Sequence, residues 1–67
     1  MRYDGFARPG ALERAGHVGE IHDPAGRVWF RAVWRDPAGD LWARVCGRWF
    51  KLHHKRTRDG VPVYLAW

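Results

Sequence analysis

The tetrapeptide Asp-Pro-Ala-Gly occurs twice in the chain, at 23–26 and again thirteen residues later at 36–39. Asp at the first position accepts a hydrogen bond from the turn backbone, Pro fixes φ at the second, and Gly at the fourth tolerates a left-handed φ. This composition is typical of a type I turn that closes a β-hairpin. Thirteen residues fit a strand of about eight residues plus a turn, so the repeat predicts a β-meander and is too short for a solenoid.

Further turn signals stand at Cys46-Gly47 and in the stretch 55–60. The segments between all these turns are rich in Val, Trp, Phe, Tyr and Ile, the residue types that favour strands. We therefore expect five antiparallel strands in up-and-down order, at about 17–22, 27–34, 41–46, 48–53 and 61–67.

The first sixteen residues follow a different pattern. Pro9 to Ala15 has the composition of two helical turns, with Leu12 as its apolar contact and Gly16 as its end. Residues 1–8 form an arm in this interpretation, with Tyr3 and Phe6 docked on the sheet. The expected organisation is an N-terminal arm or short helical turn over 1–16, followed by a single small β-domain over 17–67.

The chain has 67 residues and one cysteine. This length leaves room for one small core and excludes a multidomain enzyme. A single cysteine excludes an internal disulfide and a Cys-based zinc module. No apolar run approaches the roughly 20 residues that cross a bilayer, and no signal-peptide pattern is present. We expect a soluble cytoplasmic protein without a membrane partner.

The turn positions also predict which residues lie opposite one another and share a face. The expected pairs are as follows: Arg35 with Asp40, Trp34 with Leu41, Ala32 with Ala43 and Phe30 with Val45; Leu41 with Leu52, Ala43 with Phe50 and Val45 with Arg48; Leu52 with Val63 and Phe50 with Leu65. All three registers bring apolar side chains to one face. The expected core is Val28, Phe30, Ala32, Trp34, Leu41, Ala43, Val45, Phe50, Leu52, Val61, Val63 and Leu65, with Ile21 opposite Val28.

The first strand alternates less regularly. Alternation from Ile21 puts Gly19 and His17 inward and Val18 outward, which predicts a β-bulge near Gly19. A bulge curls a small sheet, so the meander is expected to close into a barrel. In strand number, residues 17–67 are similar to small SH3-like barrels. Those barrels include nucleic-acid binders and peptide binders alike, so the resemblance does not decide the function.

The opposite face of the predicted sheet combines aromatic and cationic side chains. Trp42 is expected across from Lys51, Arg44 across from Arg31 and Trp49, and Lys51 across from Tyr64. Aromatic rings offer stacking surfaces to nucleobases while neighbouring cations neutralise phosphates. The residues of this expected face are Trp29, Arg31, Val33, Trp42, Arg44, Trp49, Lys51 and Tyr64.

Positive charge is concentrated near the C-terminus. The formal net charge is +5, and residues 48–67 carry five cations against one acid. A basic cluster is typical of a polyanion partner, although an arginine-rich composition also fits a GC-rich genome. Lys55, Arg56 and Arg58 lie in the run 51–58, which we expect to pass from a strand into a loop and to lie over phosphates.

These features predict a non-enzymatic nucleic-acid-binding accessory module, with DNA and RNA, single and double strands, left open. The alternative is a small protein–protein interaction module, such as a phage or plasmid inhibitor or an adaptor, that uses Trp29, Trp42 and Trp49 as interface anchors. Self-association through the aromatic face, or coverage of that face by residues 1–16, are further alternatives.

Neither a metal site nor an enzyme is predicted. Four histidines and Cys46 supply enough ligand types for zinc, but they lack the paired spacing of a metal motif. No nucleophile with its base and orienting acid, no glycine-rich phosphate loop and no cofactor motif is evident.

Overall fold

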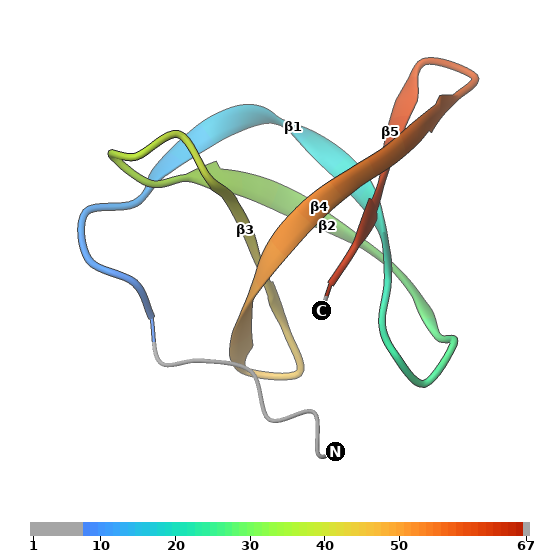
Figure 1. Ribbon diagram of the computed structural model, residues 1–67, viewed down its shortest axis with the longest axis horizontal. Coiled ribbons are helices and arrows are strands. Elements are labelled where there is room, and N and C mark those ends of the chain that lie inside the picture. Colours follow the sequence, from blue (N-terminus) through green and yellow to red (C-terminus); the bar gives the residue numbers. More distant parts are fainter. Residues whose placement is uncertain (1–7, 67) are drawn as a thin grey trace.

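The computed structural model describes residues 8–66, which form five β-strands and no helix (Figure 1). The strands are β1 (Glu13–His22), β2 (Val28–Arg35), β3 (Leu41–Val45), β4 (Arg48–Arg58) and β5 (Val61–Leu65). Consecutive strands pair antiparallel, and β5 pairs in parallel with β1, which closes the sheet into a barrel. The predicted all-β meander and its closure into a small barrel, consistent with an SH3-like architecture, are confirmed.

The segment before β1 differs from its prediction. Residues 8–12 are irregular and β1 begins at Glu13, so the helical turns expected over 9–15 are wrong. Glu13 pairs with Arg35 and Arg14 with Trp34. A helix of two turns is only marginally stable on its own, whereas pairing with β2 provides hydrogen-bond partners for the backbone of this segment. The expected docking of Tyr3 and Phe6 lies outside the described residues.

Both Asp-Pro-Ala-Gly segments close hairpins, but each loop is one residue shorter than expected. In the first, the amide of Gly26 donates to the carbonyl oxygen of Asp23 at 3.0 Å, and the amide of Asp23 donates to the carbonyl of Arg27 at 3.0 Å. The turn at 36–39 repeats both hydrogen bonds. The glycines have φ of 84° and 91°, so each forms a left-handed bulge within the hairpin, and the Asp faces the residue after the Gly.

The shorter loops shift the register of β2 by one residue and so reverse which of its faces points inward. Arg35 pairs with Leu41, Ile21 pairs with Trp29, and Val33 is fully buried. The expected pairs that this shift replaces are Arg35 with Asp40, Trp34 with Leu41, Ala32 with Ala43, Phe30 with Val45, and Ile21 with Val28. The β2 residues wrongly expected in the core point outward: Val28 and Phe30 are exposed, and Ala32 and Trp34 are partly buried.

The register of β3 and β4 is confirmed residue by residue. Leu41 pairs with Leu52, and Ala43 pairs with Phe50. Cys46 and Gly47 form the expected two-residue turn, with positive φ values of 52° and 76°. This combination is that of a type I′ hairpin turn, whose twist matches that of the flanking strands.

The last hairpin is longer than predicted. β4 continues to Arg58, where the loop was expected, and the turn is made by Asp59 and Gly60, with φ of 51° and 80°. The register shifts between His54 and Arg56, which leaves Lys55 as an extra residue in β4. Because the turn comes later than expected, the expected pairs Leu52 with Val63 and Phe50 with Leu65 are wrong. The strands pair as Arg56 with Val63 on one side of the bulge and as His53 with Leu65 on the other.

The barrel core is small and apolar. Gly19 and Ile21 point inward and Val18 outward, as predicted, but the irregularity of β1 lies between Arg14 and Val18 and not near Gly19. The side chains of the central cluster come from all five strands and the residue after β5: Ile21, Val33, Ala43, Val45, Phe50, Leu52, Tyr64 and Ala66, with Ala15, Trp29 and Leu41 packed against them. Of the expected core residues on β5, Val63 is fully buried, Leu65 is partly buried and Val61 is exposed.

Candidate nucleic-acid interface

The structure divides the predicted aromatic and cationic face into separate regions. The register of β2 moves Trp29 and Val33 toward the barrel interior, and Tyr64 is buried in the core. Two predicted pairings are therefore wrong. The register in which Trp34 pairs with Trp42 does not place Arg31 across from Arg44, and Tyr64 pairs with His54 and not with Lys51.

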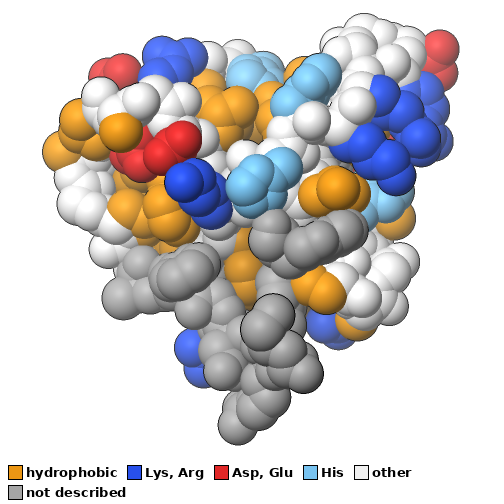
Figure 2. All heavy atoms as spheres, in the orientation of Figure 1, with side chains coloured by type: hydrophobic (Ala, Val, Ile, Leu, Met, Phe, Trp, Pro, Cys, Tyr) orange, Lys and Arg blue, Asp and Glu red, His pale blue; other side chains and the backbone are white. Residues whose placement is uncertain are grey.

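The basic hairpin, which we define as β4 from His53 onward, the turn and β5, extends away from the body of the barrel (Figure 1). Every residue from His53 to Val61 is exposed. Figure 2 shows lysine and arginine side chains gathered over this hairpin, with histidine side chains beside them. Lys55 and Arg56 form no salt bridge with any acid in the described part of the chain. The hairpin therefore presents positive charge on a narrow two-stranded ribbon.

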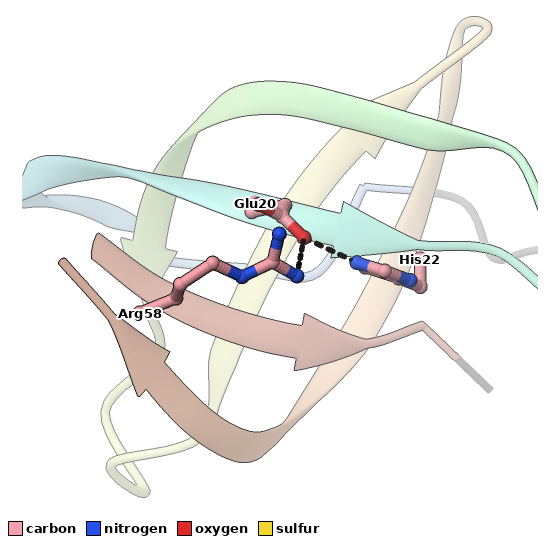
Figure 3. Close-up of polar contacts among 3 residues, drawn as sticks. All are labelled: Glu20, His22 and Arg58. Carbon is pink, nitrogen blue, oxygen red and sulfur yellow. Dashed lines mark hydrogen bonds and ion pairs between the residues drawn. The ribbon is translucent and has the colours of Figure 1, made fainter.

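A buried carboxylate on β1 fixes one side of the basic hairpin (Figure 3). Glu20 is only 8% exposed, and its Oε2 accepts hydrogen bonds from His22 Nε2 at 2.5 Å and from a guanidinium nitrogen of Arg58 at 3.2 Å. The hydrogen bond from His22 lowers the pKa of Glu20 below its ordinary value; burial opposes this shift, and the positive charges of Arg58 and Arg56 add to it. Arg58 thus has an intramolecular partner, and Lys55 and Arg56 are the cations better placed for a ligand.

An aromatic and imidazole cluster holds the inner side of the same hairpin. His54 makes an edge contact with the Tyr64 ring at 5.6 Å between centroids, and His17 Nε2 lies 3.0 Å from the Tyr64 hydroxyl. Burial raises the pKa of Tyr64. Tyr64 is consequently a structural residue of the hairpin base and not the exposed aromatic that its position on β5 suggested.

Three tryptophans gather on the outer face of β2, β3 and β4, and we call Trp34, Trp42 and Trp49 the outer tryptophan cluster. Trp34 pairs across the strands with Trp42 and makes an edge contact with Trp49 at 5.8 Å between ring centroids. The guanidinium carbons of Arg14 and Arg8 lie 5.2 Å and 6.0 Å from the Trp34 and Trp49 rings. Trp34 was expected in the core; the one-residue shift of β2 brings it to this cluster.

On this face, Lys51 and Arg44 occupy the positions that the predicted register of β3 and β4 gives them. Trp42 pairs with Lys51 and Arg44 pairs with Trp49. Lys51 also forms an ion pair with Asp40 at 3.2 Å, in which both side chains are 45% exposed. Trp49 itself is only 9% exposed. The cluster therefore offers a ligand less aromatic surface than the sequence indicates.

The two Asp-Pro-Ala-Gly turns each fasten a tryptophan six residues after the Asp. Trp29 Nε1 donates to Asp23 Oδ2 at 3.0 Å, and Trp42 Nε1 donates to Asp36 Oδ2 at 2.9 Å. The repeat is thus a seven-residue unit with Trp at its end, and the equal spacing in the sequence is a signal that could have revealed it. Both indole N–H groups are engaged by their own turn.

These hydrogen bonds also set the ionisation of the two turn carboxylates. Burial by itself raises the pKa of Asp23, but the hydrogen bonds from Trp29 and from the amide and side chain of Arg27 outweigh it and the pKa is lowered. The hydrogen bond from Trp42 lowers the pKa of Asp36, against a smaller effect of burial. Each turn is therefore held by a carboxylate that stays ionised at neutral pH.

Trp29 and Arg31 form a further region at the start of β2. The guanidinium carbons of Arg31 and Arg27 lie 5.1 Å and 5.6 Å from the Trp29 ring centroid. Arg27 is ion-paired with Asp23, whereas Arg31 donates a hydrogen bond to the carbonyl of Phe30 at 3.0 Å. Arg31 is exposed, so it is the cation of this region that a ligand reaches.

Among residues 8–66, no group of three or more His, Cys, Asp or Glu side chains is arranged to hold a metal ion. The same residues include no helix that could cross a membrane. In comparisons with known proteins, no family model, no curated protein and no solved structure matches the chain.

Proposed function

We propose that this chain is a non-enzymatic nucleic-acid-binding module whose principal contact is the basic hairpin. The observation that carries the proposal is the placement of Lys55 and Arg56 on an exposed two-stranded ribbon, with no salt bridge to the described acids. When cationic side chains without an acidic partner neutralise phosphates, the counterions condensed on the nucleic acid are released. This release supplies most of the affinity of non-specific binding.

The fold supports the proposal because it ties both strands of the ribbon to β1. Arg58 on β4 hydrogen-bonds Glu20, and Tyr64 on β5 is buried with its hydroxyl 3.0 Å from Nε2 of His17. Preorganised cations lose less conformational entropy on binding than cations on a mobile loop. The net charge of +5 also favours rapid encounter with a polyanion.

The protein-interaction alternative is less well supported by these contacts. It uses Trp29, Trp42 and Trp49 as anchors, and interface anchors act by burying an available aromatic side chain in a partner. The indole N–H groups of Trp29 and Trp42 already donate to Asp23 and Asp36, and Trp49 is largely buried.

Fluorescence anisotropy with labelled single- and double-stranded oligonucleotides tests the proposal. We expect micromolar binding at low salt that weakens as salt is raised. The variant Lys55→Gln/Arg56→Gln should bind at least about tenfold more weakly, because two cations that neutralise phosphates are removed. Arg35→Gln/Arg48→Gln removes the same charge elsewhere and should bind nearly as wild type. Absence of micromolar binding of either oligonucleotide at low salt would contradict the proposal.

A further inference from the structure

The most exposed aromatic side chain in residues 8–66 is Phe30, not a tryptophan. Phe30 is 59% exposed, while Tyr64, Trp49 and Phe50 are buried. The other tryptophans in this part of the chain are partly buried. A single exposed apolar side chain is common on protein surfaces, so Phe30 indicates a binding surface only together with exposed apolar neighbours.

The left-handed glycine of the first turn is what exposes Phe30. It sets the register in which Phe30 pairs with Glu20 and points away from the barrel. Val28, two residues earlier on the same face, is 49% exposed, and Val18 on β1 is 54% exposed. These three side chains form an apolar strip on the outer face of β1 and β2.

A cation of the basic hairpin borders this strip. Glu20, the cross-strand neighbour of Phe30, receives the Arg58 hydrogen bond at 3.2 Å, so an arginine of the basic hairpin reaches the side of the Phe30 position. The guanidinium of Arg58 offsets the charge of Glu20, which reduces its repulsion of a phosphate.

We infer, on the basis of the proposed function, that the ligand is single-stranded nucleic acid and that a nucleobase stacks on Phe30 while the adjacent phosphates contact the basic hairpin. In a duplex the faces of the bases are already stacked on one another, so contact with a side chain requires unstacking at a cost of about a few kcal/mol per step. In a single strand they are free, and an aromatic ring beside cations is the combination that binds them.

The inferred contact rests on stacking of bases and not on recognition of their edges. The chain contains no Asn and no Gln, the side chains that pair bidentately with adenine. Stacking accepts every base, because each one has an aromatic face. The expected ligand is therefore a single strand of varied sequence.

The test compares wild type, Phe30→Ala, Phe30→Trp and the control Leu12→Ala by anisotropy, with a labelled oligothymidine of about 12 nucleotides and a mixed-sequence duplex. We expect wild type to bind the single strand more tightly. Phe30→Ala should raise the single-strand Kd by about 5- to 100-fold and change the duplex Kd less than about twofold. Phe30→Trp should restore single-strand binding, and Leu12→Ala, which removes an apolar side chain outside the strip, should change it little.

The outcomes separate this inference from the function on which it rests. If both probes bind and Phe30→Ala leaves the single-strand Kd unchanged, or if the duplex binds more tightly, the stacking inference is overturned and the proposed function stands. If neither probe binds at low salt, both are overturned. Urea unfolding of Phe30→Ala confirms that any loss of binding is not a loss of fold, as expected for an exposed side chain.

Discussion

At the scale of the residue, Gly19 shows how closely the barrel is packed. A Cβ atom at this position would lie 2.6 Å from Cε2 of Tyr64 and 3.1 Å from a methyl group of Val33. Gly19 is therefore required by the close approach of β1 to the Tyr64 ring, and not by its backbone conformation.

Gly19→Ala is predicted to lower the free energy of unfolding by about 1–3 kcal/mol, because the buried ring has to shift to admit the methyl group. Gly10→Ala is the matched control. No atom lies within 4 Å of the Cβ position at Gly10, so its unfolding midpoint should stay near that of wild type. Urea unfolding followed by tryptophan fluorescence measures both, and equal midpoints would contradict the packing described for Gly19.

Asp23 is a second residue whose substitution should be costly. It is 4% exposed and accepts hydrogen bonds from the amide of Arg27 at 2.8 Å and from Trp29 Nε1. Asp23→Ala leaves these donors unpaired, and we predict a loss of about 1–3 kcal/mol in urea unfolding. Asp40→Ala removes only the exposed ion pair with Lys51 and should cost less than about 1 kcal/mol. A smaller effect at Asp23 than at Asp40 would disagree with the turn structure.

At the scale of the element, the turns determine what the sequence could and could not predict. The register of β3 and β4 was predicted correctly because the predicted two-residue turn at Cys46-Gly47 is the turn that the structure has. The register of β2 was predicted wrongly because the left-handed Gly in each Asp-Pro-Ala-Gly turn was counted as part of a four-residue loop. One residue of error reversed a face, and it placed Phe30 inside and Val33 outside.

The same register explains why two identical turns place their tryptophans differently. Odd-numbered residues face inward on both β2 and β3. Because the repeat is thirteen residues long, the tryptophan after the first turn has an odd number and the tryptophan after the second turn has an even number. Trp29 therefore packs against the core while Trp42 lies on the outer face. This relation could be predicted from the sequence once the loop length was known, whereas the bulge at Lys55, which has no glycine or other local signal, could not.

Cys46 is predicted to be a weak point of the turn between β3 and β4. It holds a φ of 52°, a conformation that costs most side chains about 1–2 kcal/mol and that Asn tolerates. Cys46→Asn should raise the free energy of unfolding by up to about 1 kcal/mol, measured by urea unfolding under reducing conditions. Cys46→Ser removes the thiol without this gain, and a stabilisation of both variants alike would assign the effect to the thiol and not to the turn.

At the scale of the whole molecule, the stability of the barrel depends on carboxylates that stay ionised. The pKa values of Glu20, Asp23 and Asp36 are all lowered by the contacts described above. A lowered pKa in the folded state means that the unfolded chain takes up protons first as pH falls. The stability contributed by these groups is complete above the ordinary carboxyl pKa of about 4 and is lost below it.

Unfolding experiments between pH 6 and pH 3 should therefore show a free energy of unfolding that falls as pH passes below about 4. Asp36→Asn cannot titrate at this position but keeps an oxygen that accepts from Trp42, so its stability should fall less steeply over the same interval. An identical pH dependence in Asp36→Asn and wild type would contradict the role assigned to this carboxylate.

The distribution of charge over the molecule connects the fold to the proposed function. The concentration of cations near the C-terminus could be predicted from the sequence, but their arrangement could not, because the run 51–58 was expected to end in a loop. Continuation of β4 to Arg58 aligns Lys55 and Arg56 on a ribbon, while Arg35 and Arg48 lie at the ends of other strand pairings.

The salt dependence of oligonucleotide binding tests this account most directly. For a single strand, the slope of log K against log salt falls in magnitude by about 0.7 for each phosphate that the protein no longer neutralises. Lys55→Gln/Arg56→Gln should reduce the magnitude of the slope by about 1.4, and Arg35→Gln/Arg48→Gln should leave it close to wild type. Equal slopes for the two variants would show that the basic hairpin does not bind the nucleic acid.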